Sequence, residues 1–99
     1  MPSTFDIIAG IIARTCDIPR NAITPGCHLL NDLGIDSLDL FDIGFAVDDA
    51  FGITMPLGQW LHEVHLKVVP AERYLVMREL CVRVDNLISA GMLATSFGL

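Results

Sequence analysis

The residues that suggest chemistry lie around Ser37, in the segment GIDSLDLFDIGFAVDDAFGI over residues 34–53. The serine stands between Asp36 and Asp39, directly ahead of a long apolar run. A helix that begins there presents free backbone amides and a partial positive charge, which stabilise a phosphate attached to the hydroxyl. A plain N-cap is the alternative role, and it accounts for Asp36 or Ser37 but not for both. A nucleophilic enzyme fits less well, because there is no GxSxG elbow and no histidine nearby in sequence to act as base.

The helix that would position Ser37 is expected to run from Ser37 to Phe51 and to end at Gly52. At about 100° per residue, one arc gathers the residues expected to face the core, which are Leu40, Ile43, Gly44, Val47, Ala50 and Phe51. The opposite arc combines carboxylates with large apolar side chains, namely Leu38, Asp39, Phe41, Asp42, Phe45, Asp48 and Asp49. Exposed apolar groups rimmed by one sign of charge are typical of a surface that binds a partner. The alternative is that Phe41 and Phe45 are covered by the preceding loop or by the segment after Pro56.

The charges of the chain are unevenly distributed. The net charge is −6, and no lysine or arginine lies between Arg20 and Lys67, whereas residues 67–85 carry both signs. This pattern predicts one strongly acidic side and one mixed side. It argues against nucleic acid as a ligand, because the phosphates would be repelled. It favours protein partners that carry basic patches.

Two segments precede the Ser37 helix. A first helix is expected over about residues 3–15, capped by Ser3 or Thr4, with a stripe of isoleucines facing the core. A long loop is expected over residues 16–35, where prolines and glycines interrupt the pattern. A loop of this length inside a compact domain is usually functional.

The segments after Gly52 complete an all-α fold. Residues 57–69 are ambiguous and predict at most a short helix followed by a loop, and a last helix is expected over about residues 71–89. The predicted architecture is a small bundle of three main helices plus a short one, with the long loop between the first two. One domain is expected over residues 1–90, followed by a flexible C-terminal tail over residues 91–99.

Other residue types give expectations about compartment and metal. Three cysteines without a CxxC spacing favour reduced thiols in a cytosol. The N-terminal residues lack the cationic stretch of a signal peptide, and no apolar run reaches the roughly 20 residues of a membrane span. His62, Glu63 and His65 do not assemble the four ligands of a zinc site, so no metal is expected. Trp60 is expected to fill the core rather than to bind a ligand.

The segment LGIDSLDLFDIGFAVDDAFGI resembles the signature of acyl carrier proteins, in which the serine of Asp-Ser-Leu bears a 4′-phosphopantetheine arm. The resemblance covers the whole chain: first helix, long loop, acidic second helix, Gly-Ile-x-x-Pro and final helix. It implies that Ser37 is the attachment point of a 4′-phosphopantetheine derived from CoA, and that the modifying synthase contacts Asp36. It also implies that the acidic-apolar arc is a docking face for partners, in agreement with the helical wheel.

The resemblance further implies what the protein does and with whom. We expect a carrier without catalytic activity of its own, which presents acyl thioesters to a phosphopantetheinyl transferase, acyl-chain elongation enzymes and an acyltransferase with basic docking patches. A cytoplasmic monomer is expected. A peptidyl carrier and an unmodified helical adaptor are the alternatives, and only the carriers require a serine at position 37.

Two features depart from ordinary fatty-acid carriers. Gly44 stands where the family usually has a larger aliphatic residue, and it either opens room for an acyl chain or permits close helix packing. The stretch from Leu57 to Tyr74 is longer than usual, and with the helix after it resembles the specialised alphaproteobacterial carriers of very long acyl chains for lipid A. Similar extended carriers serve sphingolipid synthesis, which is the alternative pathway.

Overall fold

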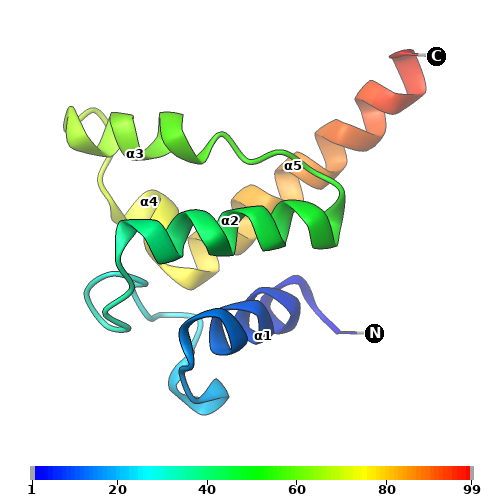
Figure 1. The fold of residues 1–99 in the computed structure, drawn as a ribbon. Coiled ribbons are helices and arrows are strands. Elements are labelled where there is room, and N and C mark those ends of the chain that lie inside the picture. Colours follow the sequence, from blue (N-terminus) through cyan, green and yellow to red (C-terminus); the bar gives the residue numbers. More distant parts are fainter. Residues whose placement is uncertain (1, 99) are drawn as a thin grey trace.

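A computed structural model of the chain describes residues 2–98, with side chains described as far as Ala90. In this range the chain forms helices and no strands: α1 (Thr4–Cys16), a short 3₁₀ turn η1 (Arg20–Ala22), α2 (Ser37–Phe51), α3 (Leu57–His65), α4 (Glu72–Leu75) and α5 (Met77–Gly98). Figure 1 shows α1 on one side of α2 and α3 on the other. The expected all-α bundle with three main helices is confirmed, and α4 is an additional short helix.

Helix α1 begins with a capping box. The Ser3 hydroxyl accepts a hydrogen bond from the Asp6 amide at 3.1 Å, and the Asp6 carboxylate accepts one from the Ser3 amide at 3.4 Å. Ile8 and Ile12 of this helix face the core and are fully buried, as the isoleucine stripe predicts. The Thr4 hydroxyl also donates to the Asp85 carboxylate at 2.6 Å, which connects the start of α1 to α5.

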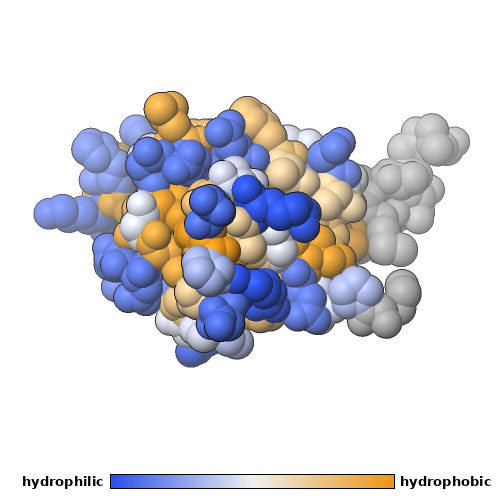
Figure 2. All heavy atoms as spheres, turned by 60° about the horizontal axis from the view of Figure 1, so that its bottom comes forward, coloured by the Kyte–Doolittle hydropathy of each residue, from blue (hydrophilic) through white to orange (hydrophobic). Residues whose placement is uncertain are grey.

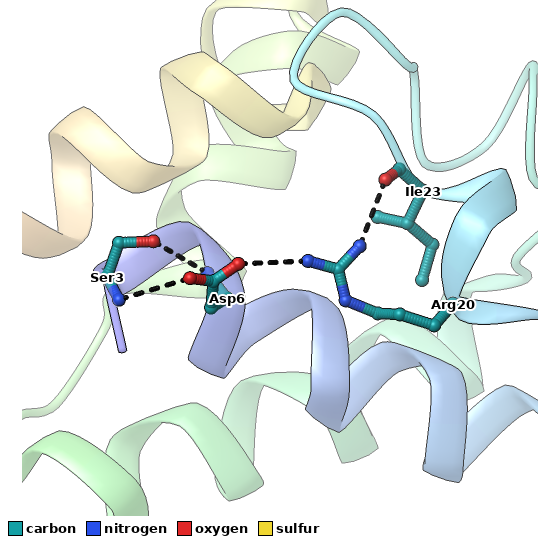
Figure 3. Close-up of polar contacts among 4 residues, drawn as sticks. All are labelled: Ser3, Asp6, Arg20 and Ile23. Atoms are coloured by element: carbon teal, nitrogen blue, oxygen red, sulfur yellow. Dashed lines mark hydrogen bonds and ion pairs between the residues drawn. The ribbon is translucent and has the colours of Figure 1, made fainter. Parts of the chain in front are cut away.

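Arg20 holds the first part of the long loop against α1 (Figure 3). One guanidinium nitrogen lies 3.1 Å from the Asp6 carboxylate, and another donates to the Ile23 carbonyl at 3.3 Å. The guanidinium also lies over the Phe5 ring, 5.1 Å from its centroid. Because Ile23 and Leu29 are buried, the loop over residues 16–35 is attached to the core rather than free in solvent.

The expected last helix over residues 71–89 is wrong at its start, because the chain breaks at Val76 into α4 and α5. Val76 is extended, with ψ of 133°, and forms an isolated antiparallel bridge with His28. The Leu29 amide donates to the Leu75 carbonyl at 2.9 Å, and the Met77 amide donates to the Cys27 carbonyl at 3.0 Å. These backbone groups pair with the long loop instead of continuing one helix. Helix α5 then runs to Gly98, past the expected end.

The domain boundary expected near residue 90 stays a prediction. The side chains of residues 91–99 lie outside the described part of the chain, so the expected flexible tail is not tested.

No helix in the described range is long and apolar enough to cross a membrane. On the side where α1 lies, hydrophilic groups interrupt the hydrophobic surface (Figure 2).

Candidate functional site

At the start of α2, one residue caps the helix and the next residue is exposed to solvent. Asp36 is the N-cap, and its carboxylate accepts a hydrogen bond from the Asp39 amide at 2.8 Å. Ser37 is the first helical residue and its side chain is exposed. Because Asp36 makes the cap, the Ser37 hydroxyl is not needed for it. Helix α2 ends at Phe51 with Gly52 in the left-handed conformation (φ 66°), so both expected boundaries are confirmed.

A hydrogen-bonded turn before α2 positions this start. The Gly34 amide donates to the Leu30 carbonyl at 3.1 Å, and the Ile35 amide donates to the Leu29 carbonyl at 3.2 Å. Gly34 has a φ of 67°, a conformation that favours glycine. Ile35 is buried next to this turn, so the residue two places before Ser37 is anchored in the core.

The core face of α2 is largely as expected. Leu40, Ile43, Gly44 and Val47 are buried, and Phe51 is half-buried against the core. The expectation for Ala50 is wrong, because its side chain is exposed. Ala50 lies at the edge of the core arc in the last turn of the helix, where a small side chain reaches no neighbour that would cover it.

The opposite face of α2 presents apolar side chains to solvent. Leu38 is 79% exposed, Phe45 68% and Phe41 37%, so neither the preceding loop nor the segment after Pro56 covers them fully. An exposed patch of this kind on one helix is typical of a binding surface.

The carboxylates of this face differ from one another. Asp42 and Asp49 are exposed, whereas Asp39 and Asp48 are half-buried. The Asp48 carboxylate accepts a hydrogen bond from the Met55 amide at 2.9 Å, so it also holds the turn after α2 in place. Among the side chains described, no lysine or arginine forms an ion pair with these aspartates.

The negative field of this region reaches the end of α1. Burial raises the pKa of the Cys16 thiol, and the carboxylates of Asp39, Asp36 and Asp42 raise it further. These three aspartates belong to the cap and the first two turns of α2. The electrostatic potential around Ser37 is therefore negative, and it attracts cationic groups of a partner.

A surface pocket of about 120 Å³ lies beside the exposed face, between Phe41 and Phe45 of α2 and Leu57 at the start of α3. A second, interior cavity of about 10 Å³ shares Gly44, Met55 and Leu57 with it. Leu57 and Gly58, from the segment after Pro56 that was considered as a cover for Phe41 and Phe45, line this pocket beside the two rings.

Gly44 lies on the boundary between the pocket and the cavity. A Cβ atom at this position would lie 3.0 Å from the Leu57 Cδ2 atom, so the glycine allows α3 to pack closely on α2. Of its two expected roles, close packing describes this state, in which the interior has room for no more than about one water molecule.

The other candidates take structural or surface positions. Trp60 is buried in the core, as expected, and His62 and His65 are exposed on α3. Within the part of the chain that the structure describes, no group of three His, Cys, Asp or Glu side chains could hold a metal ion.

The start of α2 fits a phosphodiester on Ser37. Its hydroxyl is exposed, and the first turn of a helix has backbone amides without an intrahelical partner. The Asp36 carboxylate accepts a hydrogen bond from only one of these amides, that of Asp39. The remaining amides and the helix dipole favour a negative group at this position.

Comparison with known proteins agrees with this geometry. Residues 6–63, more than half of the chain, match the family model described as "Phosphopantetheine attachment site". Acyl carrier protein AcpXL of Brucella melitensis is 54% identical over 90 residues, which cover 91% of this chain and 97% of the relative. The AcpXL proteins of Rhizobium etli and Rhizobium meliloti are 50% identical over 91% and 89% of this chain, and over 98% and 93% of their own lengths. The chain therefore belongs to the acyl carrier protein family, as a carrier rather than a catalyst, with a covalently attached 4′-phosphopantetheine.

Proposed function

We propose that Ser37 is the residue that bears the 4′-phosphopantetheine arm. The observation that carries this proposal is the exposed Ser37 hydroxyl at the first position of α2, left free because Asp36 makes the cap. Once attached, the arm supplies the thiol that forms the acyl thioester. The chain's own residues hold the phosphodiester at a helix N-terminus and present it to solvent. Asp36, adjacent to the attachment point, is the residue that the modifying synthase contacts.

The docking face is the exposed side of α2. It consists of Leu38, Asp39, Phe41, Asp42, Phe45, Asp48 and Asp49. The exposed apolar side chains support this role, because partners bury such groups. The exposed carboxylates attract basic patches on the partners and speed association at low salt. The partners are a phosphopantetheinyl transferase, acyl-chain elongation enzymes and an acyltransferase.

The cargo that we propose is a very long acyl chain for lipid A. Support comes from the longer segment Leu57–Tyr74 and from the likeness to carriers named AcpXL. In this segment Leu66 and Val68 are exposed, so we infer that half-buried residues such as Leu61 and Val64 face the acyl chain. The protein acts in the cytoplasm as a monomer and has no catalytic activity of its own.

The test is enzymatic modification followed by intact-mass measurement. Wild-type protein incubated with CoA and a phosphopantetheinyl transferase should gain the mass of one phosphopantetheinyl group. Ser37→Ala should gain none, while Ser89→Ala, which removes another exposed serine, should behave like wild type. No mass gain in the wild type, under conditions that modify a control carrier, would overturn the assignment and favour an unmodified helical adaptor.

A further inference from the structure

Helix α3 is attached to the bundle mainly through its buried residues, Leu57 and Trp60. At the start of α3, the Leu57 Cδ2 atom lies 3.0 Å from the position that a Cβ atom on Gly44 would take. Just before it, the Met55 amide donates a hydrogen bond to the Asp48 carboxylate. Unlike α1, which packs on both α2 and α5, α3 makes no comparably extensive contact with another helix in the described range. Leu61 and Val64 add only half-buried contacts with the core, so we expect α3 to separate from α2 more readily than α1 does.

Tyr74 of α4 holds the second half of α3. Its ring stacks on Trp60, with centroids 4.8 Å apart and an interplanar angle of 6°. Its hydroxyl donates to the Glu63 carboxylate at 2.5 Å, within the range of strong charge-assisted bonds. A tyrosine hydroxyl is protonated at neutral pH and can donate. The hydrogen bond to Glu63 raises the pKa of Tyr74 further above its usual value. Two side chains of α3 are therefore attached to one side chain of α4.

The same tyrosine also lines the interior cavity, together with Leu57 and Gly44. The cavity holds about 10 Å³, so an acyl chain that enters past Gly44 must displace side chains. Most of the lining is aliphatic, whereas Tyr74 alone among these lining residues is attached to α3 by a hydrogen bond to a carboxylate. Displacing Tyr74 therefore has a specific cost, the loss of its bond to Glu63 and of its stack on Trp60.

We propose that Tyr74, held by Glu63 and Trp60, is a latch that closes α3 over the interior and sets the length of acyl chain that the bundle accepts. This inference rests on the proposed carrier function. In the latched state the inner end of the cavity is closed, and short chains end before Tyr74. A chain long enough to reach the ring breaks the bond to Glu63 and separates α3 from α4. Tyr74 is thus a specificity-determining residue whose role depends on its two partners.

The latch is tested first on the unmodified protein, by hydrogen exchange at the amides of residues 60–65. Tyr74→Phe keeps the ring and its stack but removes the donor, and should speed exchange in α3 about tenfold or more, as expected for a lost bond to a charged group. His62→Ala, an exposed change on the same helix, is the matched control and should leave exchange at the other amides unchanged. Glu63→Gln should have a smaller effect in the Tyr74→Phe background than alone, because the two residues act as one unit. Equal exchange in wild type and Tyr74→Phe would overturn the latch.

Chain-length selection is tested on protein loaded with octanoyl, hexadecanoyl and tetracosanoyl chains. The thermal midpoint of the wild type should stop rising with chain length at a shorter chain than that of Tyr74→Ala. Tyr74→Phe provides a second variant if Tyr74→Ala does not fold. Trp60 is the only tryptophan, so its emission should change in the wild type at the length at which the chain reaches Tyr74. The same dependence on chain length in all three proteins would overturn the selection role.

The two proposals fail separately. Hydrogen exchange is measured without any modification, so it decides the latch even if Ser37 accepts no phosphopantetheine. Absence of modification at Ser37 would overturn the carrier proposal and, with it, the selection of chain length. Normal modification with unchanged exchange would overturn the latch and leave the carrier proposal standing.

Discussion

The helices α1 and α2 begin with similar residues that do different work. At α1 the Ser3 hydroxyl itself makes the cap, and Asp6 completes the box from inside the first turn. At α2 the aspartate stands one residue before the serine and makes the cap instead. Ser37 is therefore exposed with its hydroxyl unused by the fold.

This difference shows how a structural and a functional serine can be told apart. Near Ser3, Arg20 pairs with Asp6 and neutralises the charge of the first turn. Near Ser37, the carboxylates have no paired cation among the described side chains, and the neighbouring Leu38 is exposed. Charges that the fold leaves unpaired beside an unused hydroxyl are available to partners, whereas those at α1 stabilise the fold.

The largest contrast is expected when the hydroxyl of each serine is removed in turn. Ser37→Ala should abolish phosphopantetheinylation and change the free energy of unfolding by no more than about 0.5 kcal/mol, as for other surface positions. Ser3→Ala should be modified at the wild-type rate but should lose about 1 kcal/mol of stability with its cap. Mass spectrometry and denaturant unfolding measure the two effects. Similar loss of stability in both variants would remove the distinction between the two serines.

The next effect in size concerns the unpaired charges. Asp42→Lys with Asp49→Lys should slow modification of Ser37 about tenfold at low salt, because electrostatic attraction to a basic partner speeds association. The difference should shrink in 1 M salt, where the screening length is about 3 Å. Circular dichroism should stay helical, since both side chains are exposed.

A control separates the docking face from net charge alone. Glu72→Lys with Glu79→Lys changes the net charge by the same amount on α4 and α5, outside the docking face of α2. Because neither glutamate belongs to the docking face, this control should be modified nearly as fast as wild type. Equal slowing in both double variants would mean that overall charge, rather than the face around Ser37, governs association.

A smaller effect is expected at Asp36, which caps α2 and which we also propose to be contacted by the modifying synthase. Asp36→Ala removes the cap of α2 and should cost about 1 kcal/mol, which lowers the thermal midpoint by about 4–8 °C in a domain of this size. Asp36→Asn keeps a good capping residue and should keep most of the stability. If the synthase contacts the carboxylate, Asp36→Asn should still be modified more slowly than wild type. A normal rate for Asp36→Asn would restrict Asp36 to its capping role.

The same comparison explains why α2 could be predicted from the sequence. Its boundaries depend on residues next to it, the cap at Asp36 and the left-handed Gly52, so local patterns suffice. The exposed apolar face follows from helical spacing within one segment. Ala50 was misplaced because spacing gives the direction of a side chain but not whether a neighbour reaches it.

The region after Leu57 was harder to predict because its structure depends on distant residues. The break at Val76 follows from backbone bonds to Cys27 and Leu29, nearly 50 residues earlier in the chain. Periodicity alone continues the helix through this position. The contact of Tyr74 with Trp60 and Glu63 likewise joins two helices across a loop, and no spacing in the sequence indicates it.

The smallest expected effect is a dependence of the α1 cap on pH. The hydrogen bond from the Ser3 amide to the Asp6 carboxylate, the nearby Ser3 hydroxyl and Arg20 lower the pKa of Asp6 below its usual value. A carboxyl whose pKa is lowered on folding stabilises the protein above its unfolded pKa and loses that contribution as the pH falls through the folded value. Wild type should therefore be slightly more stable than Asp6→Asn at pH 6, and the gap in thermal midpoint should close on titration towards pH 2. Asp49→Asn, which removes an exposed carboxylate outside any cap, is the matched control for the loss of one negative charge. A gap that stays constant down to pH 2 would show that the side-chain shape of Asp6, and not its charge, supports the cap.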